Sequence, residues 1–166
     1  MGRLPAMYGD LPIKRRIPYQ MYGELDLGAS ATPTQFPEAT FQNQNNKTFE
    51  IHRLIPRVYA MKGGVIFNPQ PTMSVLMALV RVQFRDVALE QALGKTAVTL
   101  DALVKGSTEL TWELADPHYL PNNSQLQTTV ETLAFPAEEP FAEDIDALRV
   151  VLNWQGFLVV TGPAVA

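Results

Sequence analysis

From about residue 48 onwards, apolar and polar residues alternate in short runs, which is the pattern of a half-buried β-strand. Residues 48–55 and 108–115 alternate in this way, and residues 125–135 do so after a Pro-Asn-Asn turn signal. Residues 147–162 cover two strand lengths, with Gly156 at the position of a bend or bulge. These segments predict antiparallel strands, each with one face toward a core.

Two further segments have a less regular pattern. Residues 74–85 are almost continuously apolar, which predicts a strand buried on both faces. Residues 86–94 favour a short helix, because Asp86 has the chemistry of a helix cap and Gly94 that of a helix stop. The seven or eight strands and one short helix predict an all-β protein, an antiparallel β-sandwich or barrel.

The first 40 residues show neither strand nor helix periodicity and contain several prolines and glycines. We interpret residues 1–40 as an extended arm, neither helix nor central strand, and residues 41–166 as the β-sandwich body. The arm carries bulky apolar side chains that a free disordered segment would lack. It therefore has a surface to bind, either its own body or another subunit.

The composition excludes several classes of protein. The chain has 166 residues, enough for one domain with its own core, and 46% of them are hydrophobic. It has no cysteine, which excludes disulfides, a thiol nucleophile and thiolate zinc sites. The N-terminus lacks the apolar run of a secretory signal, and residues 73–80 are too few to span a membrane. We expect a soluble protein with no membrane partner, which is made in a reducing compartment or is indifferent to oxidation.

Charge is divided unevenly along the chain. Residues 1–62 contain eight Lys/Arg and five Asp/Glu, a net charge of +3, and residues 63–166 contain five and twelve, a net charge of −7. The basic cluster consists of Lys14, Arg15 and Arg16. Because the rest of the chain is acidic and repels phosphates, we expect no nucleic-acid partner.

The acidic residues gather in one proline-flanked stretch near the C-terminus. It contains Glu138, Glu139, Glu143, Asp144 and Asp146. A solvated acidic face is the simplest interpretation of this loop, and a salt or Ca²⁺ contact is an alternative. A third interpretation makes the loop an acidic receptor for the basic cluster of a neighbouring subunit.

The sequence holds no recognisable catalytic or metal-binding motif, and we expect no enzyme, no cofactor and no metal. Gly94-Lys95-Thr96 resembles the end of a phosphate-binding loop, but Leu89 stands where that motif needs its first glycine. The two histidines, His52 and His118, are expected to be a surface or cross-strand residue and a turn residue with a local hydrogen bond. A jelly-roll enzyme would instead bring both to one metal ion.

Aromatic residues allow a second kind of binding surface. Trp112 is in phase with apolar neighbours, so we assign it to the core. Tyr119, Trp154 and Phe157 would form a carbohydrate-binding row if they were out of phase with the core. A non-catalytic β-sandwich that binds carbohydrate or a host surface is therefore the alternative to a structural role.

The order of these segments along the chain resembles that in small jelly-roll decoration (cement) proteins of tailed bacteriophages. The resemblance rests on the proline- and tyrosine-containing arm, on FQNQNNKTFEIHRLIPRV (41–58) and on LRVVLNWQGFLVV (148–160). It implies a structural virion protein, made in the host cytoplasm, that binds and stabilises the exterior of the assembled capsid. It further implies a homotrimer whose partners are the major capsid protein and itself, and no catalytic residues. Other minor capsid or tail components share the same kind of sandwich.

In such a protein the N-terminal arm contacts neighbouring subunits. The residues of the arm that we expect to bind the partner are Tyr8, Lys14, Arg15, Arg16, Tyr19 and Tyr22.

Overall fold

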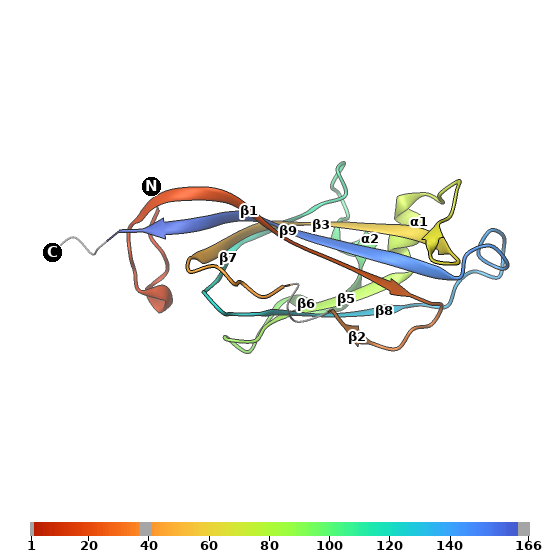
Figure 1. Ribbon diagram of the computed structural model, residues 1–166, viewed down its shortest axis with the longest axis horizontal. Coiled ribbons are helices and arrows are strands. Elements are labelled where there is room, and N and C mark those ends of the chain that lie inside the picture. Colours follow the sequence, from red (N-terminus) through yellow and green to blue (C-terminus); the bar gives the residue numbers. More distant parts are fainter. Residues whose placement is uncertain (1, 37–40, 163–166) are drawn as a thin grey trace.

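The computed structural model describes residues 2–36 and 41–162, and it is an antiparallel β-sandwich (Figure 1). The five-stranded sheet contains β1 (Ile13–Leu27), β9 (Ala147–Thr161), β3 (Thr48–Lys62) and β4 (Val65–Ile66) in that order, with β7 (Trp112–Leu120) also paired to β3. The four-stranded sheet has the order β2 (Thr34–Gln35), β8 (Leu126–Thr132), β5 (Val80–Asp86) and β6 (Gln91–Thr99). Helical turns are short: η1 (Ala6–Tyr8), α1 (Met73–Ala78) and α2 (Leu100–Leu103). The predicted all-β fold class is confirmed.

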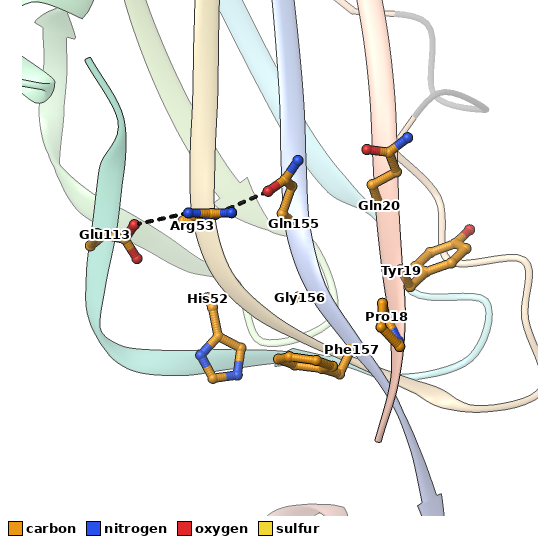
Figure 2. A pocket seen from close by; sticks show the side chains of 9 residues that line it. All are labelled: Pro18, Tyr19, Gln20, His52, Arg53, Glu113, Gln155, Gly156 and Phe157. Carbon is orange, nitrogen blue, oxygen red and sulfur yellow. Dashed lines mark hydrogen bonds and ion pairs between the residues drawn. The ribbon is translucent and has the colours of Figure 1, made fainter. Parts of the chain in front are cut away.

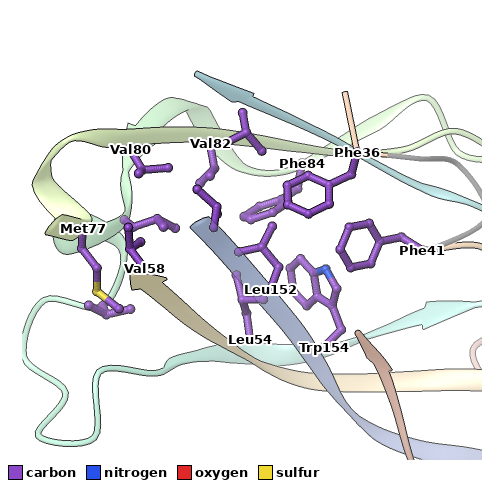
Figure 3. Packing of buried hydrophobic residues seen from close by; sticks show 14 of the residues in the cluster. Phe36, Phe41, Leu54, Val58, Met77, Val80, Val82, Phe84, Leu152 and Trp154 are labelled. Atoms are coloured by element: carbon purple, nitrogen blue, oxygen red, sulfur yellow. The ribbon is translucent and has the colours of Figure 1, made fainter. Parts of the chain in front are cut away.

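The core lies between the two sheets and is built around Trp154 of β9. The Trp154 ring is fully buried and packs edge-on against Phe84 of the opposite sheet, with ring centroids 4.8 Å apart. Leu54 and Leu152 flank the indole, as Figure 3 shows. Alternation along the strands therefore produces one continuous apolar layer, as the patterns of 48–55, 125–135 and 147–162 predict.

Two predicted elements form other structures, and a third begins later than expected, because residues 108–111 precede β7. Residues 73–78 form helix α1, which buries Leu76 and Met77, and only residues 80–86 form a strand. A short apolar run fits a buried helix as well as a buried strand, so periodicity alone cannot separate them. The predicted helix at 86–94 is a hairpin between β5 and β6. Asp86 does cap backbone amides there, those of Ala88 and Leu89, but in a turn.

The interpretation of residues 1–40 as an extended arm without strand periodicity differs from the structure over β1. β1 pairs antiparallel with β9 along its whole length, from Ile13 opposite Thr161 to Leu27 opposite Leu148. Pro18 is tolerated because β1 is an edge strand. The arm was expected to bind either its own body or another subunit, and residues 13–27 bind their own body. The expected boundary at residue 40 lies outside the described residues.

The segment before β1 also folds back on the body. Leu4 and Ile13 pack with Val159 in a small apolar cluster, and the Tyr8 ring lies 5.8 Å from that of Tyr119. Both ends of the described chain therefore lie at the same end of the sandwich (Figure 1).

A bulge interrupts the pairing of β3 with β9 at Gly156. Ile51 lies opposite Gly156 and Arg53 opposite Gln155, so His52 is the extra residue, and it belongs to β3. β9 is thus one long strand and not two. A Cβ atom on Gly156 would overlap the carbonyl oxygen of Glu50 and lie 2.9 Å from its carbonyl carbon. Only glycine permits the two backbones to approach this closely.

We predict that Gly156→Ala lowers the free energy of unfolding by at least about 2 kcal/mol, because the added methyl group must displace backbone. Urea unfolding followed by circular dichroism measures the effect. Gly28→Ala is the matched control: its Cβ would lie 3.8 Å from the nearest atom, and the change should stay within about 0.5 kcal/mol. Equal losses in both variants would contradict the assigned role of Gly156.

Candidate functional site

The outer face of the five-stranded sheet, on the side away from the core, is the strongest candidate site. At one end, residues 2–12 lie over Val159 and Tyr119. In the middle of the sheet, the outward side chains of β1, β9 and β3 are half-buried or exposed, apart from the buried Val151. A depression of about 670 Å³ is sunk into this part of the face. Its lining residues are Pro18, Tyr19, Gln20, His52, Arg53, Glu113, Gln155, Gly156 and Phe157.

The depression combines an aromatic side with a polar side (Figure 2). The His52 and Phe157 rings meet edge to face, with centroids 5.4 Å apart. Beside them, Arg53 donates a hydrogen bond of 2.9 Å to Gln155 and lies 3.7 Å from the carboxylate of Glu113. The polar groups come from three strands, so the sheet holds them in fixed positions, and the bulge at His52 turns its ring toward Phe157.

A buried carboxylate lies next to this depression. Glu50 is 1% exposed, and its two oxygens accept hydrogen bonds from Arg16 at 2.9 and 3.1 Å. His52 Nε2 lies 2.6 Å from the same carboxylate. Burial by itself raises the pKa of Glu50, but the hydrogen bonds from Arg16 and His52 outweigh it, so the pKa lies below its ordinary value. Glu50 is therefore charged at neutral pH and fixes the Arg16 and His52 side chains.

The second histidine belongs to a different cluster, on the core side of the sheet. His118 lies in β7 and not in a turn, and its Nε2 is 2.6 Å from Oδ2 of the fully buried Asp86, so its partner is not local. Burial by itself raises the pKa of Asp86, but the hydrogen bonds from His118 and two backbone amides outweigh burial, so the pKa lies below its ordinary value. This pair joins the two sheets through a buried polar contact.

The two histidines lie on opposite faces of the sheet. His118 is opposite the fully buried Ile51, whereas His52 bonds to Glu50 on the outer face. They do not converge on the single metal site that a jelly-roll enzyme would need. Among the described residues, no three His, Cys, Asp or Glu side chains are placed to hold a metal ion.

The predicted partner-binding residues of the arm divide into two groups. Tyr8 packs on Tyr119, and Tyr19 points inward onto Phe49 with ring centroids 5.0 Å apart. The more exposed members are Lys14, Arg15, Arg16 and Tyr22. Of these, Arg16 bonds Glu50, and the Tyr22 hydroxyl donates to Glu24 at 2.9 Å. Strand alternation turns Tyr19 inward and Tyr22 outward within β1, whereas Tyr8 belongs to η1. The sequence did not predict this division, because residues 1–40 were expected to show no strand periodicity.

The predicted acidic receptor loop is bound to its own chain. Lys62 lies 2.9 Å from Asp144, and the amide of Gly63 donates to Asp146. The loop precedes β9, whereas the basic cluster lies beside the end of that strand, so the two are at opposite ends of the molecule (Figure 1). Contact between them is possible only between separate chains and stays a prediction.

The predicted row of aromatic side chains is not formed. Trp154 is buried in the core, Tyr119 lies against Tyr8, and only Phe157 lines the depression. Trp154 and Phe157 are three residues apart on one strand, and this odd spacing already places them on opposite faces. Trp112 packs on Phe84 in a stacked arrangement at 5.9 Å, which confirms its assignment to the core.

Comparisons with known proteins do not assign a family. No family model matches the chain, and no curated protein matches it. One solved structure, described as "Bacillus endospore appendages form a novel family of disulfide-linked pili", is similar at 11% sequence identity, 89% coverage of this chain, 94% coverage of that chain and a TM-score of 0.34. A likeness at this TM-score carries no argument about function. Across the described ranges, no helix has the length and apolar character needed to cross a membrane.

We predict that Glu50→Gln makes stability less sensitive to acid. Because the pKa of Glu50 is lowered in the folded protein, its carboxylate stabilises the fold above the unfolded pKa, and this contribution disappears as pH falls through the folded value. The wild-type free energy of unfolding should therefore fall more steeply than that of the variant below about pH 4.5.

Urea unfolding at several pH values measures both slopes. Glu109→Gln removes a carboxylate from an exposed position and controls for the loss of one charge. Identical slopes for the wild type and Glu50→Gln would contradict the assigned role of Glu50.

Proposed function

We propose that this chain is a non-catalytic structural protein that binds other protein subunits through the outer face of its five-stranded sheet. In the form implied by the resemblance to phage decoration proteins, it binds the exterior of an assembled capsid. Its partners are then the major capsid protein and further copies of itself, and its location is the virion.

The composition of the outer face is the observation that carries the proposal. Its middle presents Arg53, Arg57 and Arg149 together with Tyr22 and Tyr59, and its cations are arginines instead of lysines. Arginine and tyrosine are enriched in protein–protein interfaces, and lysine is depleted. Tyr22 is 51% exposed, so its ring is accessible to a partner on this face.

In this proposal, neighbouring subunits are contacted by the sheet and not, as the sequence analysis expected, by an extended N-terminal arm. Residues 13–27 are held by β9, so they do not extend from the body to another subunit. In the proposed assembly, contacts come from a preformed sheet whose side chains are already fixed, and less conformational entropy is lost on binding.

Saccharide binding is the second candidate, and the depression beside Phe157 favours it. Its volume is within the range of small-ligand sites. A flat aromatic ring provides an apolar platform for a sugar, and nearby amide, guanidinium and carboxylate groups provide hydrogen bonds to hydroxyls. Gln20, Gln155 and Glu113 have this chemistry.

We predict that Phe157→Ala lowers the affinity of the chain for empty capsids of the phage that encodes it by about tenfold, since the ring lies at the centre of the proposed interface. Co-sedimentation of capsids with increasing amounts of protein measures the affinity. Val87→Ala is the matched control, because Val87 is 45% exposed in the hairpin of the opposite sheet. Capsids that bind neither the wild type nor the control would overturn the structural role.

Titration with a panel of oligosaccharides, followed by tryptophan fluorescence and calorimetry, tests the second candidate on the same proteins. Saccharide binding that is lost in Phe157→Ala, together with no capsid binding, would replace the structural role by the saccharide role.

A further inference from the structure

We propose that β1 pairs with β1 of a second copy of this chain, antiparallel, about a two-fold axis at Met21. The two five-stranded sheets then form one continuous sheet. This inference rests on the edge of the sheet and not on its outer face, so it stands or falls separately from the proposed function.

The direction of the backbone groups on β1 follows from the hydrogen bonds on the far side of the sheet. The Gln70 side chain bonds both the amide and the carbonyl of Ala60, at 2.8 and 2.9 Å, so the backbone groups of Ala60 point away from β9. By alternation, Tyr59 exchanges its backbone bonds with Arg149 of β9. The backbone N–H and C=O of Arg149 are therefore directed at β3 and not at Asp26, its neighbour in β1. The backbone groups of Asp26 consequently point to the outer edge of the sheet.

The same alternation applies to every second residue from Asp26 back to Arg16. In the described part of the chain, β1 has β9 as its only partner strand, so these amides and carbonyls are available to another strand. Pro18 is one of these residues, and its missing N–H therefore costs no bond to β9.

The available edge has two defined ends. At one end, Ile13 donates a hydrogen bond of 3.0 Å to the Gly2 carbonyl, so the leading segment already occupies the edge. At the other end, β1 finishes at Leu27. The free span runs from Arg16 to Asp26, a length of about 35 Å, and its middle residue is Met21. A second β1 that uses the whole span must place Met21 opposite Met21.

Charge complementarity identifies the occupant as another copy of this chain. In this register, Arg16 lies opposite Asp26 of the second copy, once at each end of the pair. Arg16 already bonds Glu50, and Asp26 bonds Arg149 at 2.7 and 2.9 Å. Each end of the pair would then carry a row of four charges with alternating sign: Glu50 and Arg16 of one copy, followed by Asp26 and Arg149 of the other. A parallel pairing would instead place Arg16 beside Arg16.

Apolar side chains at the edge point to the same register. Ile17 and Leu25 belong to the inner face of β1 and are only half-buried in the single chain. In the pair, Ile17 of each copy lies opposite Leu25 of the other, so this contact forms at both ends and buries both side chains further. Proline and charges on edge strands usually prevent such pairing. Here the charges oppose the wrong registers and favour this one.

Sedimentation equilibrium and light scattering over a wide concentration range test the pairing. The expected mass is twice the 18.4 kDa of the chain. Asp26→Arg places two arginines side by side at both ends of the pair and should raise the dimer dissociation constant by at least about tenfold. Asp144→Arg also breaks a surface ion pair, that with Lys62, but lies away from β1 and should leave the constant unchanged.

Two backbone substitutions have opposite expected effects. Pro18→Thr restores an N–H at the edge of each chain and should tighten the dimer by about fivefold or more. Gln20→Pro removes such an N–H and should weaken the dimer while the β9 pairing survives. Circular dichroism and thermal unfolding show that each variant is folded. A change that only altered the stability of the single chain would not produce this pair of opposite shifts.

A disulfide reports the register directly, because the chain has no cysteine of its own. Met21→Cys would place two cysteines directly opposite at about 4.5 Å between Cα atoms, within disulfide range. Mild oxidation should give a covalent dimer, whereas Glu113→Cys, on β7, should not. A monomer at all concentrations, a trimer, or a dimer that Asp26→Arg leaves intact and Met21→Cys does not cross-link would overturn the pairing. None of these outcomes decides the proposed function, which the capsid binding of the wild type and Phe157→Ala tests separately.

Discussion

The structure depends on the pairing of β9 with β1 on one side and with β3 on the other. Each of the three strands has 15 residues, and β9 is bonded along nearly its whole length to both neighbours. The pairing fixes which side of each strand faces the core, because a shift of one residue would exchange the two faces. Trp154 is buried and Gln155 exposed to the depression for this reason. Gly156 permits the close approach of Glu50 next to the bulge, where the pairing of β3 with β9 shifts by one residue.

The same pairing prepares both surfaces to which a role is proposed. The bulge at His52 and the ladder of β9 position the depression, and the free side of β1 is the edge on which a second copy fits. Neither surface needs a mobile segment or a catalytic group. Buried carboxylates with lowered pKa values, such as Glu50, are structural here, because they hold arginine and histidine side chains in place and are inaccessible themselves.

The sequence was informative wherever one face of a strand is buried and the other is wet, since alternation is then strict. Residues 48–55, 125–135 and 147–162 are examples, and the all-β sandwich follows from them. It failed for α1, whose apolar residues fit two kinds of element, and for β1, whose prolines and glycines concealed its alternation. The Asp86–His118 and Glu50–Arg16 pairs join residues far apart in the chain, and no local spacing predicts such contacts.

The position of β9 at the centre of the larger sheet also affects how the chain is made. Ile13 and Thr161 are partners, so β1 and β3 leave the ribosome long before the strand that must separate them. Until β9 is synthesised, the strand edges that pair with it have no native partner, and long-range closure of this kind slows folding. A nascent chain of this topology therefore carries unpaired strand edges for most of its synthesis, and such edges favour mispairing.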